Sequence, residues 1–146
     1  MPRPQKSFLG TALTVERTWI LVDLDGQVLG RAASKIAKLL RGKDNPRFSP
    51  NADTGHFVIA MNANKVRFTG KKLDTKIYYH HTGYPGGMKE QTARERLQKD
   101  SEKLVLDTVW GMLPKNFLSR KILTKLKVYP GETHPHQAQK FEKVTL

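Results

Sequence analysis

Histidine and tyrosine side chains gather in one stretch of this sequence, "KIYYHHTGYPGGMKE", residues 76–90. Neighbouring histidines can bind a metal ion, transfer a proton, or stack against a nucleic-acid base, and tyrosine rings can stack in the same way. The glycines that follow would let the backbone approach a phosphate closely. These residue types allow three kinds of chemistry, which other features of the sequence must separate.

A metal site would need histidines from distant parts of the chain. The sequence contains five, which are His56, His80, His81, His134 and His136. There is no H-E-x-x-H motif and no histidine pair at helical spacing. In a strand, His80 and His81 would point to opposite faces, and Pro135 separates the other close pair. We therefore expect neither a bound metal nor a cofactor.

Acidic and glycine residues after the first apolar run raise the alternative of an enzyme, such as a nucleotide- or metal-dependent hydrolase. Asp23 and Asp25 would lie near the carboxyl end of a strand, where α/β proteins usually bind ligands, but the same residues are ordinary in turns. Gly26 and Gly30 are separated by three residues and followed by Arg31, which does not match a P-loop. We expect no catalytic residues and no small-molecule substrate.

Charge dominates the composition. The chain has 146 residues, with 26 Lys and Arg against 13 Asp and Glu, a net charge of +13 and a pI of about 10.1. Such a domain attracts polyanions, nucleic acid first and an anionic membrane surface second. Cysteine is absent, which agrees with a reducing cytosol. No apolar run reaches the ~18–20 residues that span a bilayer, and "FLGTALTV" (8–15) is interrupted, so we expect a cytoplasmic protein without membrane contact.

The first half of the chain has the strand–helix–strand order of a βαβ unit. Residues 1–18 read as an extended arm, and 19–146 as a single α/β domain. Apolar runs at 19–26 and 56–61 predict two buried strands, and residues 29–41 between them have helical spacing that ends at Gly42. This order predicts a parallel sheet.

The rest of the chain predicts a hairpin and then helices. Residues 65–69 and 76–80 alternate in polarity and predict a hairpin with a lysine-bearing tip. Capping residues predict helices at 92–99, at 101–113 with Trp110 buried, and at 116–126 with its cations on the outer side. Residues 127–129 predict a last short strand.

RNA binding agrees with more of these features than any other reading. Cations crowd two helical stretches, and aromatic and glycine residues follow the hairpin. One of Tyr78 and Tyr79 must pack inward, because neighbours on a strand alternate. The candidate RNA-binding residues are Arg31, Lys35, Lys38, Arg41, Lys43, Arg47, Lys71, Lys72, Tyr78, His80, His81, Tyr84, Gly86, Gly87, Lys89, Lys115, Arg120, Lys121, Lys125 and Lys127.

Several motifs in order resemble a known family, bacterial large-subunit ribosomal protein thirteen (the universal ribosomal protein L13 family). The likeness runs from about Lys6 to the C-terminus. His56 departs from it, because members often carry an acidic residue there. The motifs are "DGQVLGRAAS" (25–34), "NADTG" (51–55), "YYHHTGYPGG" (78–87), "GMLPKN" (111–116) and "LKVYPGETHPHQAQ" (126–139).

The resemblance implies a three-layer α/β/α fold around a small, mostly parallel four-strand sheet. It also implies a structural constituent of the large ribosomal subunit that binds large-subunit rRNA, enters assembly early and touches neighbouring ribosomal proteins. Members are linked to repression of their own mRNA as well. The residues alone establish only a basic, RNA-suited α/β domain. They leave open an RNA-binding regulator outside the ribosome.

Overall fold

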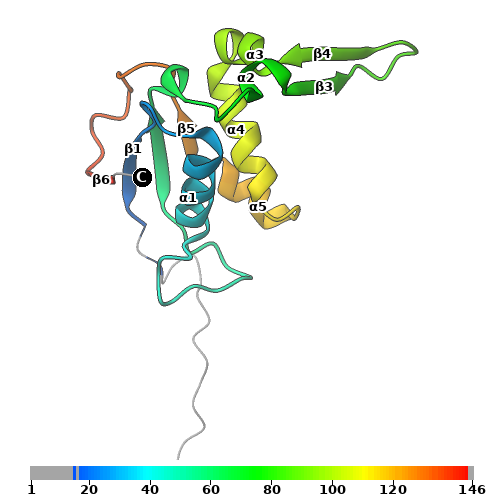
Figure 1. The fold of residues 1–146 in the computed structure, drawn as a ribbon. Coiled ribbons are helices and arrows are strands. Elements are labelled where there is room, and N and C mark those ends of the chain that lie inside the picture. Colours follow the sequence, from blue (N-terminus) through cyan, green and yellow to red (C-terminus); the bar gives the residue numbers. More distant parts are fainter. Residues whose placement is uncertain (1–14, 16, 145–146) are drawn as a thin grey trace, which may run out of the picture.

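A parallel four-stranded sheet is the frame of the protein. The computed structural model describes residue 15 and residues 17–144. The sheet has the order β5-β2-β1-β6, and every pair in it is parallel (Figure 1). Its strands are β1 (Trp19–Asp23), β2 (Phe57–Met61), β5 (Leu126–Val128) and β6 (Phe141–Val144). The α/β class and the parallel sheet are confirmed.

The β1–α1–β2 unit forms as predicted. Val22 and Ile59 are fully buried, as expected for strands that are covered on both faces. Helix α1 (Leu29–Arg41) buries one apolar side that includes Ile36 and Leu40. It ends at Gly42, whose φ of 72° is the left-handed conformation that glycine adopts without strain.

The long helices gather on one side of the sheet. Helix α4 (Ser101–Met112) packs beside α1, and the short α5 (Phe117–Leu123) follows it (Figure 1). Helix α3 (Ala93–Lys99) begins with the expected capping box, in which Thr92 and Glu95 exchange hydrogen bonds. Near the other face, the loop at 130–140 contacts Trp19 through His136. Loop residues therefore lie on this face, in the place of the second helical layer that the resemblance implies.

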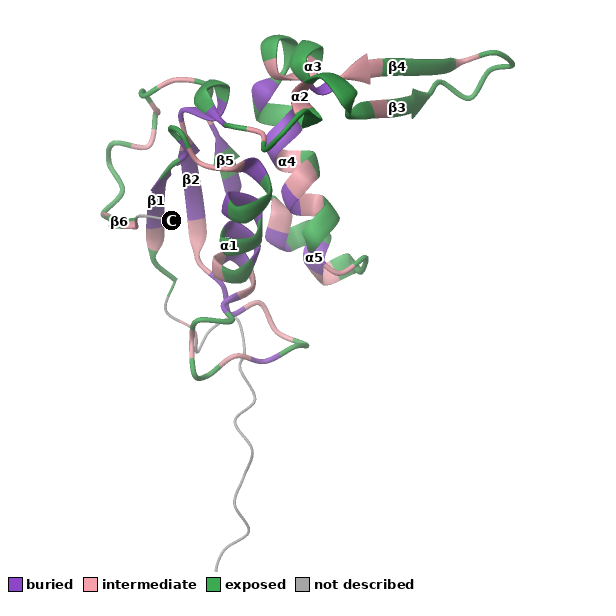
Figure 2. Cartoon of the chain, viewed as in Figure 1, coloured by how far each residue is buried: buried purple, intermediate pink, exposed green. Residues whose placement is uncertain are grey.

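The core lies between the sheet and helices α1 and α4 (Figure 2). Leu104, Val105 and Val109 supply the buried side of α4. Trp110 is only half-buried, so the prediction that it is a core residue is wrong. Trp110 lies at the edge of the buried side of α4, and the Lys115 ammonium is 4.0 Å from its ring centre.

The predicted hairpin of residues 65–69 and 76–80 is wrong. The backbone N–H of Arg67 donates to Gln27 O at 2.9 Å, and its carbonyl accepts from Leu29 N at 3.0 Å. The backbone of Arg67 is therefore bonded to the start of α1 and is not free to pair in a hairpin. Strand β3 (Ile77–His81) instead pairs antiparallel with β4 (Met88–Thr92). Lys71 and Lys72 consequently lie at the start of a helical turn, α2 (Lys72–Thr75), rather than at a hairpin tip. Residues 63–65 form a short 3-10 helix, η1 (Ala63–Lys65).

The third long helix is shorter than predicted. Asn116 caps it, with Ser119 N donating to Asn116 Oδ1 at 2.8 Å, but α5 ends at Leu123. Leu126 has helical spacing in the sequence, yet it pairs with Val58 in the sheet. Strand β6 has no counterpart in the sequence prediction, and the expected arm lies almost wholly outside the described residues.

Deleting the Leu104 side chain should destabilise the fold more than deleting the larger Trp110 side chain. Leu104 is fully buried, so Leu104→Ala should lower the free energy of unfolding by about 3 kcal/mol through lost packing and a cavity. Trp110→Ala removes a partly buried ring at the edge of the core, where solvent can enter the space it leaves, and should cost less, roughly 2 kcal/mol. Urea denaturation followed by circular dichroism measures both, and the reverse ranking would contradict this packing of α4.

Candidate nucleic-acid interface

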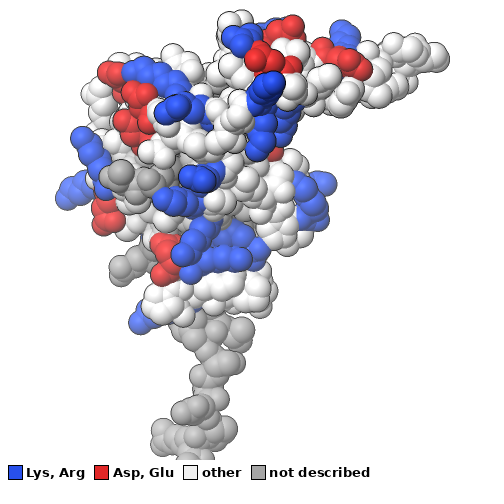
Figure 3. All heavy atoms as spheres, viewed as in Figure 1, with Lys and Arg blue, Asp and Glu red and all other residues white. Residues whose placement is uncertain are grey.

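One cation-lined hollow lies where the end of α1 meets the turn after α4. We call it the Lys38 hollow, and Lys38, Arg41 and Lys43 supply its positive charge. Its floor is apolar, formed in part by Met112 and Leu113. The helical spacing of Lys38 and Arg41 aims both away from the core, as predicted, and blue side chains gather over this part of α1 in Figure 3. Arg41 also stacks on Phe48, at 5.5 Å from the ring centre.

A second hollow, the Arg31 hollow, lies near the start of α1 and shares Met112 with the first. Four cations line it: Arg31, Arg67, Lys72 and Lys76. Arg67 and Lys76 are absent from the sequence-based candidates. No sequence signal marks them, because the Val28–Arg67 bridge brings residue 67 beside α1 only in the folded chain.

The remaining candidate cations on helices and loops line neither hollow. Lys35 is exposed on α1, and Arg47 lies in the loop that follows it. At the α4–α5 turn, the Lys121 ammonium lies 4.6 Å from the Phe117 ring centre, and Phe117 is 70% exposed. Lys115, Lys71, Arg120 and Lys127 are also exposed. A cation over an exposed aromatic ring can contact a phosphate while the ring stacks on a base.

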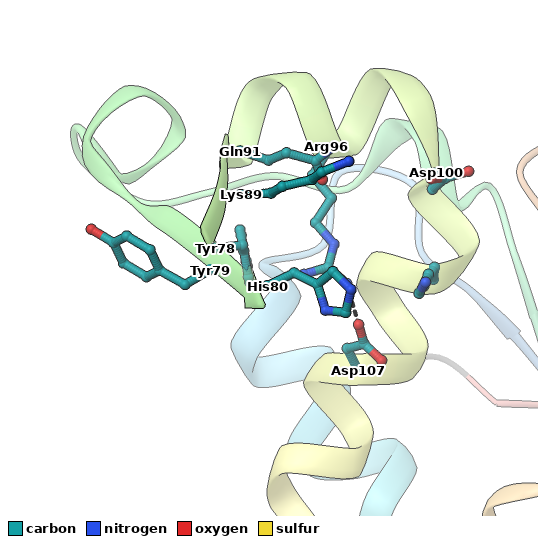
Figure 4. Close-up of a pocket in the computed structure, with 9 residues that line it drawn as sticks. Tyr78, Tyr79, His80, Lys89, Gln91, Arg96, Asp100 and Asp107 are labelled. Carbon is teal, nitrogen blue, oxygen red and sulfur yellow. Dashed lines mark hydrogen bonds and ion pairs between the residues drawn. The ribbon is translucent and has the colours of Figure 1, made fainter. Parts of the chain in front are cut away.

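The β3–β4 hairpin projects from the body of the protein, as Figure 1 shows. Tyr78 is the tyrosine that packs inward, which confirms that one of the pair does so. Arg96 lies over its ring at 4.6 Å and forms an ion pair with Asp107 of α4 (Figure 4). Burial raises the pKa of Tyr78 above its ordinary value, although the Arg96 charge opposes this. Tyr78 and Arg96 therefore join the base of the hairpin to α4.

The outer part of the hairpin is open to solvent. His80, His81 and Lys89 are exposed, and Tyr84 at the tip is 77% exposed. Gly83 and Gly86 have φ of 91° and 72°, so the bend needs glycine at both positions. Gly83 N donates to His81 Nδ1 at 3.0 Å, which uses that ring nitrogen within the tip.

Lys125 must be removed from the candidate interface. The sequence prediction places it among the exposed cations, but it is 5% exposed, because α5 ends before it. Its ammonium donates to Asp53 Oδ1 and to Gly55 O at 3.0 Å. Burial lowers the pKa of Lys125, and the hydrogen bond to Asp53 opposes that shift. The side chain joins β5 to the segment before β2 and has no surface for RNA.

The acidic residues at the end of β1 and in the following turn contact each other, because Asp25 N donates to Asp23 Oδ1 at 3.0 Å. Asp23 Oδ1 accepts from Asn62 Nδ2 at 2.8 Å, and this bond lowers the pKa of Asp23. Lys65 lies 3.6 Å from Asp25 and 3.0 Å from Glu132, and the hydrogen bond to Glu132 raises the pKa of Lys65. These contacts hold the turn after β1 in place, and they do not form an acid–base pair in a substrate pocket.

The remaining histidines lie apart from the hairpin. His134 and His136 have ring centres 6.4 Å apart, and Tyr129 Oη lies 2.8 Å from His136 Nε2. His56 bridges Thr18 at 2.8 Å and Asp44 at 3.2 Å, so this departure from the family pattern has a structural partner on each side. Across residue 15 and residues 17–144, no three histidine, cysteine, aspartate or glutamate side chains are grouped to hold a metal. Within the same residues, no helix is long and apolar enough to cross a bilayer.

Fold and surface together define a class: a basic α/β domain with open, cation-lined hollows and a projecting hairpin. The family model described as ribosomal protein L13 matches residues 17–135. The chain is 54% identical over 142 residues to a Thermotoga maritima protein named large ribosomal subunit protein uL13, covering 97% of this chain and 95% of the relative. The proteins of the same name from Agathobacter rectalis and Syntrophobacter fumaroxidans are 53% and 55% identical, covering 94% and 90% of this chain and 96% and 92% of theirs.

This chain therefore belongs to the ribosomal protein L13 family. That family comprises structural, non-enzymatic components of the ribosome. Membership in this family excludes the hydrolase alternative, and this conclusion does not depend on the shape of any pocket.

Proposed function

We propose that this chain, as a structural component of the large ribosomal subunit, binds large-subunit rRNA with its α1 face and supports early assembly of the subunit. The α1 face is the exposed side of α1 together with the Lys38 and Arg31 hollows beside it. The observation that carries the proposal is the pair of hollows on either side of Met112. Among the described residues, seven cations and no Asp or Glu line these hollows. The cations are Arg31, Arg67, Lys72, Lys76, Lys38, Arg41 and Lys43. Phosphate contacts from Lys and Arg supply most of the affinity in such interfaces and fix the register of the protein.

The hairpin tip supplies a second kind of contact. Residues 82–87 contain no Lys or Arg, but Tyr84 offers an exposed ring and Gly86 a bare backbone. Unpaired bases stack on such rings, and RNA loops and bulges present unpaired bases. We infer that the α1 face holds the phosphate backbone while the tip reaches a non-helical part of the RNA.

Co-sedimentation tests the proposal against a regulator outside the ribosome. The tagged chain should remain with purified large subunits through a high-salt wash and be absent from small subunits. Cells depleted of it should accumulate incomplete large-subunit particles that lack it. Release at low salt, or depletion without a large-subunit defect, would contradict the proposal.

Tyr84→Ala should weaken binding to free large-subunit rRNA by roughly 1–3 kcal/mol, the usual contribution of one stacked base. The fold should stay intact, because the ring is 77% exposed. His80→Gln is the matched control on the same hairpin and should have a smaller effect. Filter binding measures both affinities, and elemental analysis of the purified protein should find no stoichiometric zinc. Full affinity in the Tyr84 variant would exclude stacking at the tip.

A further inference from the structure

The two faces of the β3–β4 hairpin differ in chemistry. Tyr79 lies opposite Glu90 and His81 opposite Met88, and directly opposed residues share a face. One side, which we call the Tyr79 face, consists of Ile77, Tyr79, His81, Met88, Glu90 and Thr92. The other side carries Tyr78, His80, Lys89 and Gln91.

The Tyr78 side turns toward the rest of this chain. Its residues line a hollow together with Arg96, Asp100, Lys103 and Asp107, and Tyr79 also borders this hollow. Figure 4 shows Tyr78 near Arg96, while the ring of Tyr79 points away from α4. The Tyr78 side therefore turns toward α4, whereas the Tyr79 face is mostly open to solvent, with Tyr79 62% exposed.

The Tyr79 face is unusually apolar for an exposed surface. Ile77, Tyr79 and Met88 are 40%, 62% and 57% exposed. Along this face Tyr79 lies between Ile77 and Met88. The hairpin that carries them projects beyond the helices (Figure 1). A two-stranded hairpin is marginally stable by itself, and adjoining exposed apolar side chains on such an element mark an interaction surface.

Charge indicates what kind of partner fits. Glu90 is the charged strand residue on the Tyr79 face, whereas Lys89 lies on the other side. Residues 80–88 contain no charged residue, and the outer hairpin is white in Figure 3. A surface with a carboxylate and no Lys or Arg repels phosphates, so it is poorly suited to RNA. It suits an apolar protein surface with a cation placed beside Glu90.

We propose that the Tyr79 face docks onto another protein of the large subunit, one that offers apolar side chains and a Lys or Arg for Glu90. The hairpin would then lie between RNA at its tip and protein along one face. The inference rests on the proposed function, because it requires this chain to be in the subunit.

The double variant Tyr79→Ser, Met88→Ser tests the docking surface with two readouts. Its affinity for free large-subunit rRNA should stay within about twofold of wild type, because the face makes no RNA contact. In competition with wild type for incorporation into reconstituted large subunits, it should be at least about tenfold weaker, as for loss of interface anchors. Both side chains are exposed, so the melting temperature should be unchanged. Weakened binding to free rRNA would indicate an RNA partner, and equal incorporation would indicate a bare face. Either result would overturn the inference.

Glu90→Lys separates the partners further. It should leave binding to free rRNA equal or stronger, since it adds a cation, yet reduce incorporation into subunits. A benzophenone-bearing residue at position 79 should cross-link, in intact subunits, to a peptide of another subunit protein that contains Lys or Arg. A cross-link to RNA or to a second copy of this chain would contradict the proposal. Failure of the wild-type chain to enter subunits would instead refute the proposed function.

Discussion

Replacing Lys35, Lys38 and Lys43 with glutamine should weaken binding to large-subunit rRNA by about a hundredfold at ~0.1 M salt. Each lysine that neutralises a phosphate releases counterions and contributes about 0.7–0.9 to the slope of log K against log salt. We expect roughly 6–8 neutralised phosphates in the wild type and a slope between about −4 and −7. The triple variant should flatten that slope by roughly two to three units. All three lysines are exposed, so the fold should persist.

The matched control removes the same charge elsewhere. Lys99, Lys140 and Lys143 are exposed and lie outside both α1 and the two hollows. Their replacement with glutamine changes the net charge equally and should leave the slope nearly unchanged. Fluorescence anisotropy across a salt series measures both variants. Equal losses in the two would mean that net charge, and not the α1 face, determines affinity.

Lys125→Met should lower the free energy of unfolding by about 2–3 kcal/mol. Removing one member of a buried ion pair typically costs 3–5 kcal/mol, because the partner charge is left uncompensated. We expect a loss just below that range, since the Asp53 side chain is 19% exposed and lies 3.6 Å from Arg17. The variant also strands Gly55 O, which accepts from the ammonium at 3.0 Å.

Lys127→Met is the control, because Lys127 is an exposed lysine on β5 two residues after Lys125, and it should change stability by less than about 0.5 kcal/mol. Adding Asp53→Asn to Lys125→Met should recover part of the loss, since no unpaired charge then remains. Urea denaturation monitored by tryptophan fluorescence measures the three variants. Stability equal to wild type in Lys125→Met would contradict the buried pair.

Local sequence determined the elements whose signals need no distant partner. Apolar residues at helical spacing and Gly42 define α1, Thr92 and Glu95 cap α3, and Asn116 caps α5. Each signal acts within one or two turns, so it can be read before the chain folds. The apolar runs of β1 and β2 flanking a helix likewise require a parallel sheet.

Only tertiary structure decided the pairing of strands and the environment of single side chains. Alternation at 65–69 fits a hairpin strand, but Arg67 bonds to the backbone beside Val28 across a long sequence separation. Strand β6 has four residues, two of them charged, and it is held by pairing with β1. Local periodicity carries no information about such partners.

The charged residues show the same division between what the sequence determines and what the tertiary structure determines. The sequence establishes a net charge of +13 and places cations on one side of α1. It cannot distinguish Lys125, buried against Asp53, from exposed Lys127 two residues later. Nor does it reveal that Arg67 and Lys76 join Arg31 in one hollow. Burial and proximity of charges depend on how distant segments pack, which is why the candidate surface took its final composition from the fold.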